Sequence, residues 1–146
     1  MVANLDGPLM FTALIREASR RFALGTRAAA LVNELLRLIA RTPGGLAGFL
    51  ARFEAAGTGP LASSWLGDSE SEPMTAGQLE GALGVDTLHR IGRKVGLPAE
   101  TVGPALAFLV PRVIGMLTPD RVVPADLPAG VSARLSGRAP KPGRPV

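Results

Sequence analysis

The sequence of 146 residues contains no cysteine and only one histidine, His89. The absence of cysteine excludes disulfide bonds, thiolate metal sites and cysteine nucleophiles, but it leaves the redox compartment of the protein open. Any catalytic triad, general-base pair or histidine metal site would have to use His89. Asp86 lies three residues earlier on the same face of a predicted helix, but enzymatic sites normally need a third positioned group. We therefore expect no enzyme activity, no catalytic residue and no cofactor.

The chain also lacks long apolar runs and nucleotide-binding motifs. Its longest uncharged apolar stretch, 101–111, ends at Arg112 and is too short to span a bilayer, and residues 1–9 do not form a secretory signal. The sequence contains neither G-x-x-x-x-G-K-[ST] nor a strand that could present a glycine-rich loop. Acidic residues alternate in 68–72 like the start of a calcium loop, but Pro73 replaces the required glycine. These observations predict a soluble, cytoplasmic protein with no metal site and no membrane span.

Charge is distributed unevenly along the chain, which has a net charge of +4. Residues 1–56 contain seven basic and four acidic groups, whereas residues 57–86 contain five acidic groups and no basic one. Residues 87–121 contain five basic and two acidic groups, and residues 122–146 contain four and one. An acidic middle between basic flanks could steer one copy onto another, although modest charge blocks on helical proteins are usually solvated faces.

Residues 1–43 show the pattern of an N-terminal helical hairpin. A first amphipathic helix is predicted over 9–24, and Thr26 is a candidate N-cap for a second helix that ends before Pro43. The apolar face of the second helix could cover the core of the same chain or form a self-association seam. The residues of that candidate seam are Ala28, Val32, Leu35 and Ile39.

Residues 44–124 predict a compact series of further helices. Two short helices come first, one over 44–57 and one carrying Trp65, the only tryptophan. In the first of them we expect Leu46, Phe49, Leu50 and Phe53 to face the core. Thr75 and Gln78 have the spacing of a capping box that opens a third helix, and Asp86 is a candidate cap for a fourth.

A helix-turn-helix spacing then leads into the last helix. Gly92 permits close approach of two helices, and Gly96 supplies the left-handed residue that ends the first of them. The run 102–117 is apolar on nearly every side, which is typical of a helix at the centre of a core. Pro104 and Pro111 leave open whether this helix is broken.

The order and spacing of these elements closely resemble the YidB-like family of small bacterial proteins. The resemblance covers about residues 44–124 and is carried by Gly44 to Leu50, Trp65-Leu66-Gly67, Gln78-Leu79, Ala82-Leu83-Gly84, Gly96-Leu97 and Leu117-Thr118-Pro119-Asp120. The chain departs from the family at Pro98, where a capping serine is expected, and at the two prolines inside the last helix. The resemblance implies an all-α fold with a homeodomain-like part. It implies no activity, because the family looks functionally uncharacterised.

Two functions remain. The first is a non-enzymatic protein-interaction or scaffold module that associates with another protein or with itself, since the chain is 47% hydrophobic and surplus apolar surface seeks a partner. The second is weak, non-specific nucleic-acid binding through the helix-turn-helix unit and through a basic, Pro/Gly-rich tail, 125–146, which we expect to be flexible. The candidate nucleic-acid-binding residues are Arg90, Arg93, Lys94 and Arg112.

Overall fold

The computed structural model describes residues 11–67, 74–118 and 123, and every regular element within these residues is an α-helix. The expected all-α fold class is confirmed. The tail 125–146 and the acidic segment 68–72 lie outside the described residues. The helices are, in chain order, α1 (Thr12–Phe22), α2 (Arg27–Arg41), α3 (Gly45–Ala55), α4 (Gly59–Ser63), α5 (Ala76–Leu83), α6 (Val85–Val95) and α7 (Ala99–Leu117).

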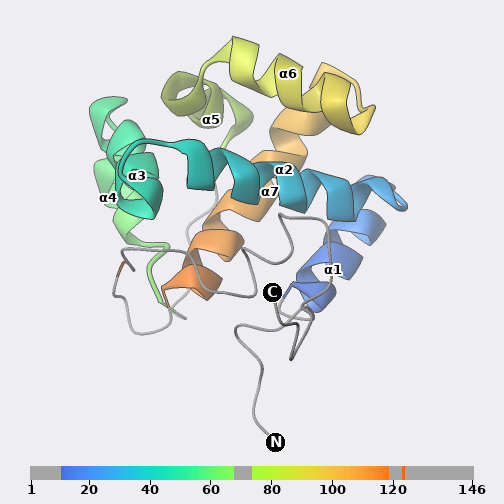
Figure 1. Ribbon diagram of the computed structural model, residues 1–146, viewed down its shortest axis with the longest axis horizontal. Helices are drawn as coiled ribbons and strands as arrows, with labels where there is room; N and C mark the ends of the chain where they lie inside the picture. Colours follow the sequence, from blue (N-terminus) through green and yellow to red (C-terminus); the bar gives the residue numbers. More distant parts are fainter. Residues whose placement is uncertain (1–10, 68–73, 119–122, 124–146) are drawn as a thin grey trace, which may run out of the picture.

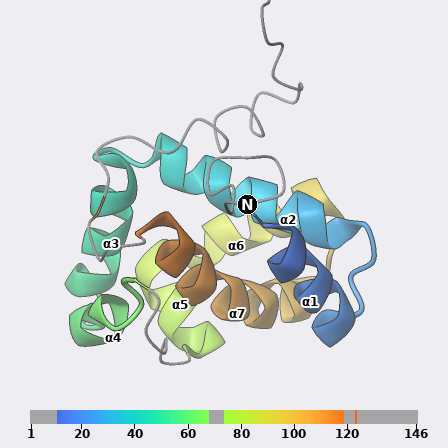
Figure 2. The same ribbon diagram turned by 90° about the horizontal axis from the view of Figure 1, so that it is seen from below.

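The other helices are arranged around α7. Figure 1 shows α7 passing through the middle of the molecule, with α2 crossing it and with α5 and α6 gathered above. The view from below places α3 and α4 at one end and α1 at the other, with α7 between them (Figure 2). In agreement with these views, α7 packs against α1, α2, α5 and α6. Its buried residues lie on nearly every side, so the predicted core position of this helix is confirmed.

Both prolines lie inside α7, and the helix continues through them. Pro104 is exposed near the start, whereas Pro111 is buried in the second half. An interior proline costs about 3 kcal/mol because a backbone hydrogen bond is lost. A fully buried leucine contributes about 1.5–3 kcal/mol, and both Leu106 and Leu109 have 0% exposure. Burial of several such side chains outweighs the two prolines, which is why neither of them breaks the helix.

By length and hydropathy alone, α7 would be long enough to cross a membrane. The sequence had suggested too short a span, because only 11 uncharged apolar residues are consecutive there. In the structure, 61% of the apolar window of this helix is buried inside the protein. That burial is typical of the core helix of a folded domain rather than of a helix surrounded by lipid.

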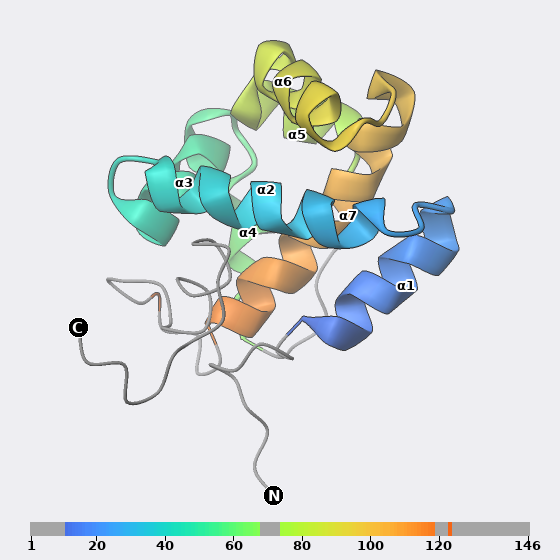
Figure 3. The same cartoon turned by 45° about the vertical axis from the view of Figure 1, so that its right-hand side comes forward.

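The N-terminal hairpin is part of the same core as the rest of the protein. The four residues of the candidate seam each have 0% exposure and belong to one apolar cluster with side chains of α3 to α7. Figure 3 shows α2 lying across α7 and beside α1. This arrangement decides between the two alternatives that the sequence left open, because the stripe on α2 faces its own chain instead of a second copy. The helices of the N-terminal hairpin and those of 44–124 share one core.

Local signals in the second half of the chain were largely predicted correctly. The Thr75 side chain accepts a hydrogen bond from the Gln78 backbone, and the Gln78 side chain accepts one from the Thr75 backbone, which completes the capping box. Gly96 is left-handed, with φ 87°, and ends α6. A side chain at Gly92 would come within 2.9 Å of the Leu97 carbonyl oxygen, so only glycine lets the turn pack this tightly against α6.

Two expected helix caps differ from the structure. The N-cap of α6 is Gly84, so Asp86 lies inside the first turn, where its carboxylate still opposes the positive end of the helix dipole. Thr26 occupies the N-cap position of α2 but makes no capping hydrogen bond with its side chain. Helix α2 therefore depends on burial of its apolar face rather than on a cap.

Candidate interaction surfaces

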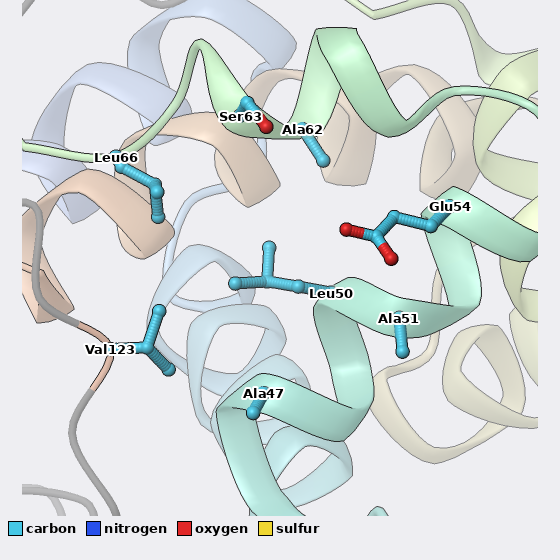
Figure 4. A pocket seen from close by; sticks show the side chains of 8 residues that line it. All are labelled: Ala47, Leu50, Ala51, Glu54, Ala62, Ser63, Leu66 and Val123. Atoms are coloured by element: carbon cyan, nitrogen blue, oxygen red, sulfur yellow. The ribbon is translucent and has the colours of Figure 1, made fainter.

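A small apolar groove lies between α3 and α4, next to Val123. Its volume is about 240 Å³, and the residues that line it are Ala47, Leu50, Ala51, Glu54, Ala62, Ser63, Leu66 and Val123. Figure 4 shows the Leu50 side chain at the centre, with Leu66 and Val123 to one side and the Glu54 carboxylate near Ala62.

The groove exists because α3 has two apolar faces. Leu46, Phe49 and Phe53 form the first face and are buried in the core. Ala47, Leu50, Ala51 and Glu54 recur at the spacing of one helix face and form the second. The five-residue helix α4 is too short to cover it. This spacing was readable in the sequence, but Leu50 was expected to point inward with the core residues.

The chemistry of the groove suits binding rather than catalysis. Glu54 is its single titratable lining residue, and this exposed carboxylate has no ion pair within the described part of the chain. One carboxylate without a second positioned group is insufficient for acid–base catalysis. It can, however, select a cationic side chain at the edge of an apolar site.

The helix-turn-helix unit places Arg90, Arg93 and Lys94 on the exposed side of α6. Lys94 is partly neutralised, because its Nζ lies 3.7 Å from Oε1 of the buried Glu34 on α2. The other oxygen of Glu34 accepts a hydrogen bond from Arg37 at 2.7 Å. The ion pair therefore links α6 to α2, and within the part of the chain that the structure describes Arg90 and Arg93 have no ion pair.

Arg112, the fourth candidate nucleic-acid-binding residue, lies on α7 and does not join the α6 cluster. It lies roughly 20 Å along α7 from the first residue of that helix, at 1.5 Å per residue. Its guanidinium lies 4.0 Å from the centre of the Phe108 ring and donates a hydrogen bond to the Phe108 carbonyl oxygen at 3.1 Å. The Arg21 guanidinium of α1 lies 4.8 Å from the same ring. Arg112 thus belongs to a second basic cluster, between α1 and α7.

His89 and Asp86 are both exposed on α6 and make no hydrogen bond or ion pair with each other in the described structure. His89 lines a depression of about 200 Å³ together with Gly92, Arg93, Leu97 and Ala99. Within residues 11–67, 74–118 and 123, no three His, Cys, Asp or Glu side chains come together as metal ligands. The arrangement around His89 is that of a solvated helix face.

Comparison with known proteins identifies relatives with the same organisation. A solved structure of a homeodomain-like protein of unknown function from Shigella flexneri is similar over 73% of this chain and 85% of that one, with a TM-score of 0.60 and 26% identity. The Escherichia coli K12 protein named uncharacterized protein YidB is 32% identical over 77 residues, which are 52% of this chain. Those residues cover 58% of the relative, so less than two thirds of its length is matched. The model of the YidB-like protein family matches residues 20–126, which include the last three residues of α1 and all of α2 to α7. The chain therefore belongs to the YidB-like family.

Proposed function

We propose that this chain is a non-enzymatic protein-interaction module that binds a partner segment in the groove between α3 and α4. The observation that carries the proposal is a concave apolar site, with partly exposed Leu50, Leu66 and Val123, that ends at the free carboxylate of Glu54. Such a site fits one or two aliphatic side chains next to a lysine or arginine. General surplus of apolar surface is a weaker argument, because Val85 is the one large hydrophobic side chain exposed among the described residues.

The partner that we propose is a second copy of the chain. The sequence Val131-Ser132-Ala133-Arg134-Leu135 combines aliphatic and basic side chains in the order that the groove fits. Val123, eight residues earlier, already lines the groove. Two copies that exchange these segments would bury apolar surface and would pair Arg134 with Glu54.

Reading of DNA by the helix-turn-helix unit is the less favoured function. In readers of this type, the start of the second helix presents polar side chains to base edges. Here the exposed residues at the start of α7 are Ala99, Glu100 and Pro104, and Lys94 on the preceding helix is paired with Glu34. A carboxylate at this position would repel phosphates, so the geometry supports the interaction module instead.

The test is self-association of the full chain, measured by sedimentation over a range of concentrations. Glu54→Lys changes an exposed residue and should weaken self-association at least about tenfold, which corresponds to about 1.4 kcal/mol. Leu50→Glu should do the same, whereas Val85→Glu is the matched control on α6 and should have no effect. A parent protein that is monomeric at every concentration, or variants that associate like the parent, would refute the proposal.

A further inference from the structure

Two arginines from distant parts of the chain converge on one phenylalanine. Arg21 on α1 and Arg112 on α7 lie 4.8 and 4.0 Å from the centre of the Phe108 ring, so their guanidinium carbons are within about 9 Å of each other. The Phe22 ring meets Phe108 edge to face, with centroids 5.8 Å apart, and fixes the position of that ring. Two cations are therefore held near each other on packed aromatic side chains instead of moving freely in solvent.

This pair carries no counter-charge. Neither Arg21 nor Arg112 has an ion pair in the described structure, where the ion pairs belong to Arg37 and Lys94. Their separation is shorter than or close to the screening length at physiological salt, so the two charges repel each other and both attract an anion. Glu17 is the one acidic residue of α1, and it does not pair with either arginine.

Helix α1 carries two further exposed arginines, beside a depression that Arg21, Phe108 and Arg112 do not line. Arg16 and Arg20 lie one turn apart on the outer face of the helix and line a broad, shallow depression of about 450 Å³. Thr12 and Ser19 add hydroxyl groups to the same depression. Arginines and hydroxyls are the side chains that most often contact nucleic-acid phosphates. Arg21 and Arg112 are themselves exposed, and an exposed surface suits an extended polymer better than a small molecule, which needs a concave site.

We propose that Arg21 and Arg112 form a phosphate clamp that binds the backbone of nucleic acid without reading its sequence. The planar guanidinium fork donates two parallel hydrogen bonds to a phosphate, and stacking on Phe108 orients the fork in advance. The Phe108 ring packs against both arginines and against Phe22, so it is not free to stack on a base. Binding is therefore electrostatic, indifferent to sequence and dependent on salt. The clamp formed by Arg21 and Arg112 is a different site from the α3–α4 groove.

The experiment compares two double variants that each remove two positive charges from the full chain. Arg21→Ala with Arg112→Ala removes the clamp, and Arg90→Ala with Arg93→Ala is the matched control on α6. Binding to a labelled mixed-sequence duplex is measured by fluorescence anisotropy between about 50 and 200 mM salt. We expect the clamp variant to bind about tenfold more weakly at low salt. The slope of log affinity against log salt should become less steep by roughly two units, because each lost phosphate contact removes about 0.9 from its magnitude. The control should keep most of the parent slope.

Three results would overturn the clamp. They are a parent that does not bind the duplex at low salt, a control variant that loses as much binding as the clamp variant, and a clamp variant that binds like the parent. Circular dichroism must show that both variants keep the parent helicity.

The double variant Arg21→Lys with Arg112→Lys keeps the charge but loses the fork, so its affinity for the duplex should lie between that of the parent and that of the alanine variant. Binding to vesicles that contain phosphatidylserine tests the alternative ligand. If the parent binds the vesicles but not the duplex, and the clamp variant binds neither, the site contacts a membrane surface and the nucleic-acid proposal is wrong. Glu54→Lys should leave duplex binding above that of the clamp variant, which separates this test from that of the groove.

Discussion

Helices α2 and α3 carry similar apolar patterns, but the fold surrounds them differently. The stripe Ala28, Val32, Leu35 and Ile39 on α2 is completely buried, because this helix contacts α1, α3, α6 and α7. Helix α3 meets α2, α4 and α5, and its second face around Leu50 stays partly open. From the sequence, the α2 stripe could have covered its own core or formed a seam with a second copy, and Leu50 was expected to face the core. The comparison teaches that an amphipathic period shows where a helix is apolar, but not whether its own chain covers that face.

The largest effect that tests this comparison is removal of residues 1–41. Without α2, the core loses fully buried Leu31, Leu35 and Leu36, and α7 is left exposed along one side. We expect the remaining chain to lose cooperative thermal unfolding. Circular dichroism during heating measures this loss. A truncated protein that melts cooperatively near the parent temperature would show instead that the helices after residue 44 form a stable core without the hairpin.

An intermediate effect is expected from paired leucine truncations on the two helices. Leu35→Ala should lower the free energy of unfolding by about 2–5 kcal/mol, because it empties a fully buried site. Leu50→Ala should lower it by only about 1 kcal/mol, since that side chain already contacts solvent at the groove. Urea titration of both variants measures the difference. Equal losses would show that the groove is closed in solution.

The smallest effect concerns the ion pair that joins α6 to α2. Lys94→Ala should lower the free energy of unfolding by no more than about 1 kcal/mol, because the Lys94 side chain is 49% exposed and exposed ion pairs contribute little. Arg93→Ala, on the same helix but without an ion pair in the described structure, provides the baseline. A loss above about 2 kcal/mol for Lys94→Ala would mean that charge, rather than apolar burial, holds α2 in place.

Much of the fold could be predicted from short stretches of the chain. The helices, the capping box at Thr75 and the turn at Gly96 all follow from interactions within a few residues. The apolar run of α7 correctly indicated a central helix. Less of the candidate sites could be predicted. Arg112 was named with the α6 cations as a candidate nucleic-acid contact, but only the fold brings it to Phe108 beside Arg21, because that meeting depends on how α1 and α7 pack.

The sequence by itself determined an all-α protein of the YidB-like family, with seven helices in the described residues and a tight helix-turn-helix. These properties depend on backbone conformation and on hydrogen bonds between near neighbours, which a few residues encode. Only the tertiary structure decided that α7 continues through Pro104 and Pro111, that the α2 stripe is buried, and that Arg21 and Arg112 meet at Phe108. Each of these depends on which faces of distant helices pack together, and that choice is made by the burial of the whole core.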